Sequence, residues 1–331
     1  MIKIDEDTIF NIIKERKPRR VAINGPEGLF REIEKVADKI MDKFGIEVYI
    51  IGDTCYGSCD INLHAAEMVN ADILFHVAHT ISMKEMFNGK VVMINAFDDI
   101  KFDSVVVKCF DILSNYKNIG LVTDSQHLME INNVRSILSK RFNVIIGKGK
   151  GQLNDAQVFG CEFYPVYNSD VDAYIFLGQS MFHAAGVAMV TNKPTFMLDP
   201  YFNEVKEVNT FANTLKKRSI LSIYKAVDAK RFGIVVGLKE GQLMLNRVAT
   251  IKKRLEEHEK IVRLIALTNI TEDRLQLFDM DAFIQIACPR ISIDNPFKKP
   301  VLSIPQAYAL LDLLDGKELE IDKVFNIPHW L

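Results

Sequence analysis

The sequence lacks an excess of charge of either sign. Its 331 residues carry 41 lysines and arginines against 43 aspartates and glutamates, which gives a formal net charge of −2 at pH 7. Nucleic acids attract proteins through clustered positive charge, so this balance gives no reason to expect a nucleic-acid partner. It favours a small-molecule or a protein substrate.

Long apolar segments are absent as well. Hydrophobic residues make up 48% of the chain and charged residues 25%, the proportions of an ordinary globular protein with room for two or three domains. The first twenty residues, MIKIDEDTIFNIIKERKPRR, have neither the apolar stretch nor the small-residue cleavage site of a secretory signal. We therefore expect a cytoplasmic protein that is not associated with a membrane.

Cysteine is scarce, with five residues at positions 55, 59, 109, 161 and 288. Secreted disulfide scaffolds carry even numbers of closely spaced cysteines, and this odd, scattered set does not fit that class. The cysteines are therefore predicted to be reduced thiols. Some can serve as ligands, and others will simply be buried.

What the sequence does contain is a threefold repeat, because three kinds of segment each occur three times in the same order. Each copy starts with an apolar strand that runs into a loop: RRVAINGPEGL, KNIGLVTDSQH and KRFGIVVGLKEGQL. An aspartate then opens a second apolar run, in ADILFHVAHT, VDAYIFLGQS and MDAFIQIACP. A lysine opens a third, in GKVVMINAF, NKPTFMLDP and KKPVLSIPQA. Such self-similarity indicates repeated structural units.

Helical patterns lie between these strand signals. LFREIEKVADKIMDKFG, for example, places apolar residues at three- and four-residue steps and charges on the opposite face. Strands that alternate with helices predict parallel sheets covered by helices. We predict an α/β protein of three pseudo-repeated domains with parallel four-stranded sheets, at residues 1–102, 103–210 and 211–331. One large doubly wound sheet is the alternative, but the agreement of three signals favours three domains.

Each repeat has one cysteine in a loop just beyond a strand. Cys59 and Cys161 follow the second strand of their repeats in glycine-containing loops, and Cys288 follows the third strand, which Pro289 ends. Open α/β sheets place their ligand sites at such strand ends. If the domains pack around a pseudo-threefold centre, the three thiols converge there. Three ligands would leave one coordination position of a bound metal open.

The softness of thiolates favours an iron–sulfur cluster, zinc or Cu(I) over hard cations. Burial alone is the alternative, since free cysteine is among the most buried residue types. For Cys109, inside DSVVVKCFDIL, burial is the better interpretation. For Cys59, Cys161 and Cys288, the adjacent glycine or proline and the distribution of one per repeat favour ligation.

The Cys-x3-Cys-x2-Cys signature of ordinary radical SAM enzymes is also missing. Cys55 and Cys59 have its first spacing, but Asn62 occupies the third position. Cys55 is left as a neighbour of the site, a spare thiol or a packing residue. A histidine beside an apolar run is more often structural than a ligand. His79 has the stronger case, because it occupies the repeat position that Cys288 takes in the third repeat.

Seven stretches spread over all three repeats carry a family resemblance: GPEGL at 25–29, GDTCYGSCD at 52–60, VFGCEFYP at 158–165, FHAAGVAM at 182–189, LDPY at 198–201, GLKEGQ at 237–242 and ACPRISID at 287–294. With them the sequence resembles the archaeal diphthamide synthases, radical 3-amino-3-carboxypropyl transferases of the first step of diphthamide biosynthesis. YGSCD and ACPRISID are the most specific stretches. The sequence departs from the family at FLGQSMFH, where it has only Gly178 in place of a glycine-rich segment.

The resemblance implies that Cys59, Cys161 and Cys288 hold a [4Fe–4S] cluster whose open iron binds the methionine part of S-adenosylmethionine. It implies that a 3-amino-3-carboxypropyl radical is transferred to C2 of a histidine imidazole on translation elongation factor 2. It also implies a homodimer and an electron donor that the sequence does not identify.

The loop GLKEGQ follows the first strand of the third repeat and is expected to open a helix. We therefore expect Lys239, Gly241 and Gln242 to contact an anionic group such as the carboxylate of S-adenosylmethionine. A plain strand–loop–helix turn, in which the glycines supply backbone freedom, is the alternative. Arg290 has two candidate partners, a carboxylate of substrate or partner and Asp294.

Two other function classes share some of these features. Quinolinate synthase, which uses an open-iron cluster in a dehydratase-type reaction, also combines three pseudo-symmetric α/β domains with three cysteines. The stretch ACPRISID argues against it. A non-enzymatic iron–sulfur carrier or a structural zinc protein is the other alternative. Structural zinc prefers a fourth protein ligand, and no histidine is clearly placed to supply one.

Overall fold

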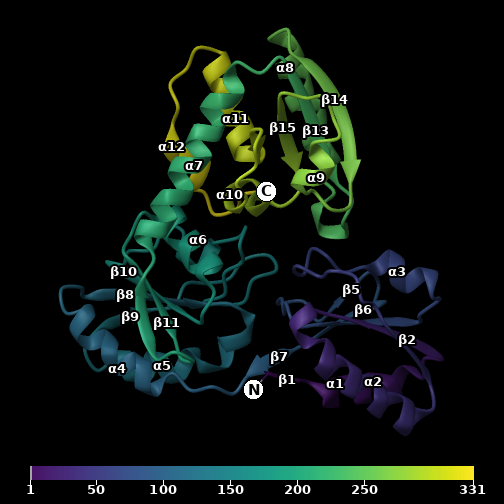
Figure 1. The fold of residues 1–331 in the computed structure, drawn as a ribbon. Helices are drawn as coiled ribbons and strands as arrows, with labels where there is room; N and C mark the ends of the chain where they lie inside the picture. The colour runs from purple at the N-terminus through teal and green to yellow at the C-terminus, as the bar shows by residue number, and fades with distance from the viewer. Residues whose placement is uncertain (1) are drawn as a thin grey trace.

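The computed structural model describes residues 2–331, and within them three separate, mostly parallel sheets stand out. In each sheet the four parallel strands have the same spatial order. If they are counted along the chain within each repeat, the second strand lies at one edge and is followed by the first, the third and the fourth. This confirms the predicted α/β fold with three pseudo-repeats and four parallel strands in each. The first and second sheets also carry an antiparallel edge strand that was not predicted. Figure 1 shows the three sheets in three lobes, with loops from each lobe directed toward the centre.

The strands have the following bounds. The first sheet consists of β2 (Arg20–Asn24), β3 (Glu47–Ile50), β4 (Ile73–Val77), β5 (Glu85–Met86) and β6 (Val91–Ile94). The second consists of β8 (Asn118–Thr123), β9 (Asn143–Ile145), β10 (Ala173–Leu177), β11 (Thr195–Asp199) and β12 (Glu204–Glu207). The third consists of β13 (Arg231–Gly237), β14 (Ile261–Leu267), β15 (Ala282–Ile286) and β16 (Val301–Leu302). A short antiparallel pair is formed by β1 (Ile2–Ile4) and β7 (Ala96–Asp98).

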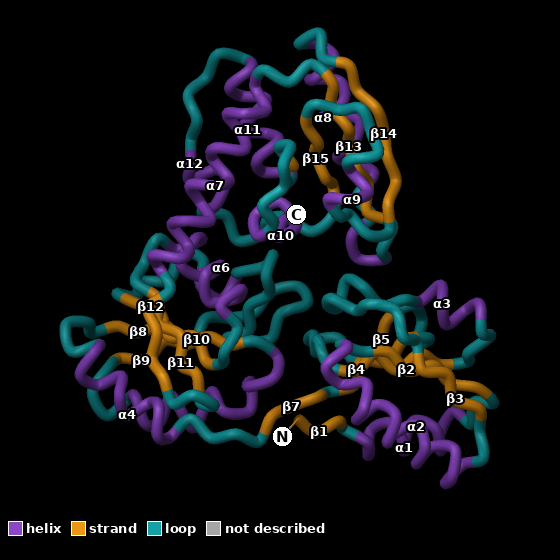
Figure 2. The backbone as a smooth tube through the Cα atoms, in the orientation of Figure 1, coloured by secondary structure: helices purple, strands orange, loops and turns teal. Residues whose placement is uncertain are grey.

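Helices pack against these sheets (Figure 2). The first repeat has α1 (Glu6–Arg16), α2 (Phe30–Phe44) and α3 (Leu63–Met68). The second has α4 (Asp103–Ile112), α5 (Ile131–Leu138) and α6 (Met181–Thr191). The third has α7 (Asn209–Val227), α8 (Leu245–Glu257), α9 (Glu272–Leu275), α10 (Pro289–Asp294), α11 (Ile304–Leu314) and α12 (Ile321–Phe325). Among the described residues, none of the helices combines the length and apolar character needed to cross a bilayer.

Helix α2 shows how the pattern of the sequence becomes structure. Its buried residues, Ile33, Val36, Ala37 and Ile40, recur at the three- and four-residue steps that place side chains on one face of a helix. That face joins a core with β2, β4 and α1. The helix ends where Gly45 adopts a left-handed backbone with φ of 63°, a conformation that costs glycine little.

The three aspartates that mark the repeats accept equivalent backbone hydrogen bonds in each sheet. Each accepts hydrogen bonds of 2.7 to 3.1 Å from two successive backbone N–H groups at the start of the first strand: Asp72 from Arg19 and Arg20, Asp172 from Lys117 and Asn118, and Asp281 from Lys230 and Arg231. The carboxylate therefore fixes the entry of the first strand beside the start of the third. This shared hydrogen bonding explains why an aspartate recurs at the same place in each repeat.

The second and third repeats share a hydrophobic core. One continuous cluster of buried residues joins β8, β10 and α6 of the second repeat to β13, α8 and α11 of the third. Helix α7 contributes its buried face, including Leu215 and Ile223, to this cluster. The first repeat is packed differently, because its two buried clusters are built almost entirely from residues 2–96.

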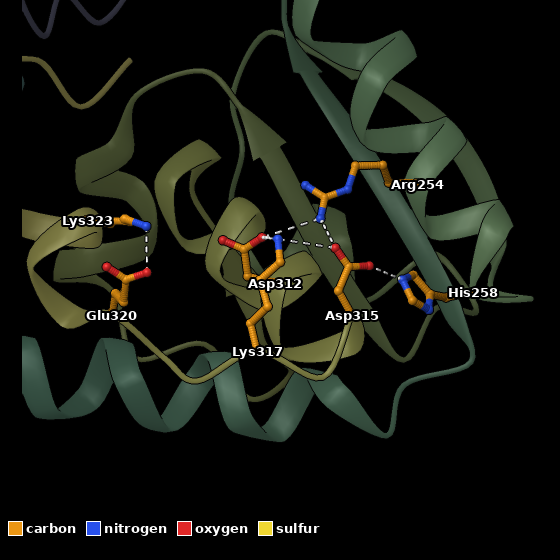
Figure 3. Close-up of polar contacts among 7 residues, drawn as sticks. All are labelled: Arg254, His258, Asp312, Asp315, Lys317, Glu320 and Lys323. Carbon is orange, nitrogen blue, oxygen red and sulfur yellow. Dashed lines mark hydrogen bonds and ion pairs between the residues drawn. The ribbon is translucent and has the colours of Figure 1, made fainter.

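Charged side chains join the end of α8 to the end of α11 on the surface of the third repeat (Figure 3). Asp315 accepts from Arg254 Nη2 at 2.6 Å and lies 2.7 Å from His258 Nε2, while Lys317 Nζ lies 2.8 Å from Asp312. A separate pair, Glu320 with Lys323, lies at the start of α12. Pairs this exposed contribute little to stability, so the packing of α8 and α11 depends on their buried faces.

Substituting a repeat aspartate should reduce stability in a pH-dependent way. The N–H groups of Asn118 and Lys117 lower the pKa of Asp172, so its stabilising contribution is present above the unfolded value of about 3.9 and is lost as pH falls through the lower folded pKa. We expect Asp172→Asn to unfold at a lower temperature than the wild type at pH 7. The two should converge in acid. Exposed Asp170→Asn is the control, and an unchanged melting temperature for Asp172→Asn would contradict this assignment.

Candidate functional site

A cavity of 670 Å³ is lined by residues of all three repeats. Its lining includes Cys59 of the first repeat, Phe182 of the second and Cys288 of the third. The two cysteines follow β3 and β15, at the strand ends where the sequence predicted ligand residues. The cavity has the size of a small-molecule site.

The thiol of Cys161 lies near the same cavity. Burial raises the pKa of Cys161 well above its usual value, and the charges of Cys288 and Cys59 raise it further. Burial and then the charge of Cys59 raise the pKa of Cys288 to about 11. Gly160, next to Cys161, packs closely against Phe182 and Arg290, which both line the cavity. The loop of Cys161 therefore lies beside the cavity that Cys59 and Cys288 line. The assignment of these three as metal ligands stays a prediction.

Cys59 is held by the GLKEGQ loop of the third repeat. The N–H of Gly241 donates to the carbonyl of Cys59 at 3.0 Å, and the amide of Gln242 donates to its Sγ at 3.4 Å. A Cβ atom at position 241 would lie 2.5 Å from the Cα of Cys59, so only glycine allows this approach. The carboxylate of Glu240 accepts from the N–H of Leu63 at 2.8 Å, which adds a second link to the first repeat.

The N–H of Gly241 and the amide of Gln242 thus both contact Cys59, and a contact of this loop with an anionic group stays a prediction. The expectation that the loop directly opens a helix is wrong. The loop forms a single 3-10 turn at Glu240–Gln242, and α8 begins only at Leu245. The loop therefore does not place the end of α8 beside a ligand.

Lys239 is buried in the wall of the cavity and forms an ion pair with Asp60. Its ammonium lies 4.6 Å from the centre of the Tyr56 ring, and Asp60 also accepts from the N–H of Tyr56 at 3.2 Å. Asp60 thus balances the charge of Lys239 and holds the backbone of Tyr56. A contact between Lys239 and an anionic substrate group stays a prediction.

The C-terminal segment supports the loop of Cys161. The N–H of Trp330 donates to the carbonyl of Cys161 at 3.0 Å, and the N–H of Phe163 donates to the carbonyl of Pro328 at 2.8 Å. The ring of Trp330 is buried and lies 4.8 Å, centre to centre, from that of Phe163. Sequence reasoning missed this support. The presence of the only tryptophan in the chain was the one available signal.

Arg290 is buried beside Cys288 and pairs with Asp294. Its Nε and Nη2 lie 2.9 Å from the two carboxylate oxygens, and Nη2 also donates to the carbonyl of Phe182 at 3.1 Å. The guanidinium lies over the Phe182 ring at 4.0 Å from its centre. Asp294 is therefore the protein partner, whereas the buried Nη1 has no hydrogen-bond partner within residues 2–331. Arg290 itself lines the cavity.

The remaining two cysteines have different surroundings. Cys109 is fully buried within α4, where its Sγ lies 4.0 Å from the carbonyl of Val105, so the interpretation of burial is confirmed. Cys55 is also buried, and its Sγ lies 3.8 Å from Nδ1 of His79. His79 does not contact the cavity lining through any hydrogen bond that the described residues show.

The family model of diphthamide synthesis proteins matches residues 25–320 of this chain. The chain belongs to this family. Among its family relatives, the 2-(3-amino-3-carboxypropyl)histidine synthase of Pyrococcus horikoshii is 32% identical, over 99% of this chain and 95% of that protein. Subunit 1 of the synthase of Schizosaccharomyces pombe is 29% identical, over 93% of this chain and 73% of that protein.

A solved structure of a family member has the same fold. The crystal structure of Dph2 from Pyrococcus horikoshii with a 4Fe-4S cluster superposes with a TM-score of 0.87 at 29% identity. The superposition covers 97% of this chain and 94% of that one.

The close approach at Gly241 generates a prediction. We expect Gly241→Ala to destabilise the protein by about 1–3 kcal/mol, because the new methyl group would force the loops of Cys59 and Gln242 apart. Thermal unfolding followed by circular dichroism would measure the change. Gly28→Ala is a matched control in the corresponding loop of the first repeat, where an added Cβ meets nothing within 4 Å. Equal stability of the two variants would show that position 241 tolerates a side chain.

Proposed function

We propose that this chain is a 2-(3-amino-3-carboxypropyl)histidine synthase. It transfers the 3-amino-3-carboxypropyl group of S-adenosylmethionine to C2 of a histidine imidazole on translation elongation factor 2, the first step of diphthamide biosynthesis. The observation that carries the proposal is that Cys59 and Cys288, which belong to different repeats, line one cavity, while the charges of both raise the pKa of Cys161. Membership of the family and 32% identity to a curated synthase support it.

The donor set fits an iron–sulfur cluster. Three partly buried cysteines offer soft thiolate ligands, and a four-iron cluster held by three cysteines keeps one iron free. The amide of Gln242 donates to the Sγ of Cys59, which is the kind of contact that tunes clusters. We propose that Cys59, Cys161 and Cys288 hold a [4Fe–4S] cluster. When bound and reduced, the cluster supplies the electron that breaks the bond between the sulfonium and the γ-carbon.

The cavity provides the remaining parts of a substrate site. S-adenosylmethionine carries a carboxylate, and the unpartnered Nη1 of Arg290 is a buried cationic donor in the cavity wall. The ammonium of Lys239 also lies in the cavity wall, where Asp60 holds it in place and balances its charge. The rings of Tyr56 and Phe182 also line the cavity, and Tyr56 is 74% exposed. These rings offer surfaces on which an incoming imidazole can stack.

The partners follow from the reaction. Transfer begins with a one-electron reduction, so an electron donor is required. The protein substrate acts in translation, which places the enzyme in the cytoplasm. The resemblance to the archaeal enzymes supports a homodimer as the working unit.

The proposed reaction can be tested anaerobically with reconstituted, dithionite-reduced protein. S-adenosylmethionine labelled in its aminocarboxypropyl group should transfer the label to archaeal elongation factor 2. Replacing Cys59, Cys161 or Cys288 with alanine removes one of the proposed ligands, so label transfer should fall to background, whereas Cys109→Ala should retain it. Intact S-adenosylmethionine in the presence of a loaded and reduced cluster would reject the transferase and favour a dehydratase or a carrier.

The role of Arg290 has its own test. Lysine cannot pair with Asp294 through two nitrogens and still present a third to the substrate, so we expect Arg290→Lys to weaken binding of S-adenosylmethionine about 10- to 100-fold. Calorimetric titration of the loaded but unreduced protein measures affinity without turnover. Exposed Lys298→Met, also in the cavity lining, is the control. If both variants bind as the wild type does, Arg290 does not contact the substrate.

A further inference from the structure

A second group of metal-ligating side chains lies beside the candidate site. Cys55, His76 and His79 each offer one ligand atom, and these atoms all lie within 4.8 Å of one another. His76 belongs to β4, His79 follows the end of that strand, and Cys55 comes from the loop that also carries Cys59. None of the three belongs to the thiol set proposed for the cluster.

His76 is the least satisfied of the three. Its side chain is fully buried, and neither ring nitrogen has a hydrogen-bond partner within residues 2–331. Leaving a buried polar atom without a partner costs about 1–3 kcal/mol. A neutral imidazole needs both a donor and an acceptor contact, and a metal ion can occupy the acceptor position. The two unpartnered ring nitrogens of the buried His76 therefore indicate that a ligand binds there.

The spacing suits a tetrahedral ion. With zinc bonds of about 2.3 Å to sulfur and 2.0–2.1 Å to nitrogen, two ligand atoms in a tetrahedral site lie roughly 3.4–3.6 Å apart. The Sγ of Cys55 and Nδ1 of His79 are separated by 3.8 Å. The backbone turns at Ala78 and His79, whose φ angles are 64° and 50°, and the imidazole of His79 lies with its ring centre 5.7 Å from that of His76. Small side-chain rotations would complete the geometry.

The protonation states also suit a metal ion. Burial lowers the pKa of His76 to about 3 and that of His79 to about 4, so both imidazoles are neutral at pH 7 and can donate a lone pair. Burial raises the pKa of Cys55 to about 12. A divalent cation would displace the thiol proton and supply the positive charge that this buried site lacks.

We propose that Cys55, His76 and His79 form a zinc site, with a fourth position open to water. One thiolate and two imidazoles are a donor set that zinc favours and that calcium and magnesium do not. Bound there, the ion would tie the loop of Cys55 and Cys59 to the end of β4. The site is independent of the proposed transferase activity, because its metal occupancy can be measured without turnover.

The test measures metals in the full-length, cluster-reconstituted protein after dialysis against micromolar zinc. We expect one zinc per chain besides the iron. Cys55→Ala and His79→Ala should each remove the zinc and leave the iron in place, whereas Cys109→Ala, also a buried cysteine, should keep both. Iron content and label transfer report the proposed cluster separately, so failure of one proposal is distinguishable from failure of the other.

Two further measurements test the proposal even if the Cys55 and His79 variants do not fold. The zinc X-ray absorption spectrum of the wild type should show one sulfur at about 2.3 Å and two nitrogens at about 2.0–2.1 Å. In a chain with Cys59, Cys161 and Cys288 all replaced by alanine, cobalt(II) should give the charge-transfer absorption of a single thiolate. Iron-loaded wild type without zinc, or zinc bound only through several sulfurs, would overturn the proposal.

Discussion

The close contact between Gly241 and Cys59 is the constraint on which the site depends. No repeat supplies more than one of the three clustered thiols, so the site exists only while loops from different sheets stay in register. The backbone hydrogen bond at 3.0 Å and the lack of room for a Cβ hold the third repeat against the first. The buried pair of Lys239 and Asp60 fixes the same junction with charge, where breaking one partner would leave the other buried and unpaired.

In this threefold architecture, repeated residues position the strands, whereas residues that differ between the repeats form the site. The repeated aspartates set the strands of each sheet in place, through the same pair of backbone N–H donors every time. The loops at the strand ends then differ, and these differences make the site. Cys288 follows a third strand where its two counterparts follow second strands, and His79 stands at the equivalent point of the first repeat. One fold repeated three times thus yields an asymmetric centre.

Much of this could be predicted from the sequence, because strand periodicity and the spacing of the repeated aspartates are local properties. The fold class and the four parallel strands of each repeat followed from them, while the role of Cys59, Cys161 and Cys288 as ligands stays a prediction. The partners of Gly241 and Gln242 could not be predicted, because they depend on how two repeats separated by some 180 residues face each other. The support of Cys161 by Trp330 and the proximity of His76 and His79 to Cys55 also involve distant segments, and no pattern within one strand encodes them.

The shared core of the second and third repeats has a consequence for how the protein is made. During synthesis the first repeat can complete its own core early, since that core lies almost wholly within residues 2–96. The second repeat cannot, because its buried face is finished by helices α7 and α11 and its Cys161 loop by Trp330. The loop of Cys161 therefore reaches its final contacts only after the third repeat and Trp330 have been synthesised.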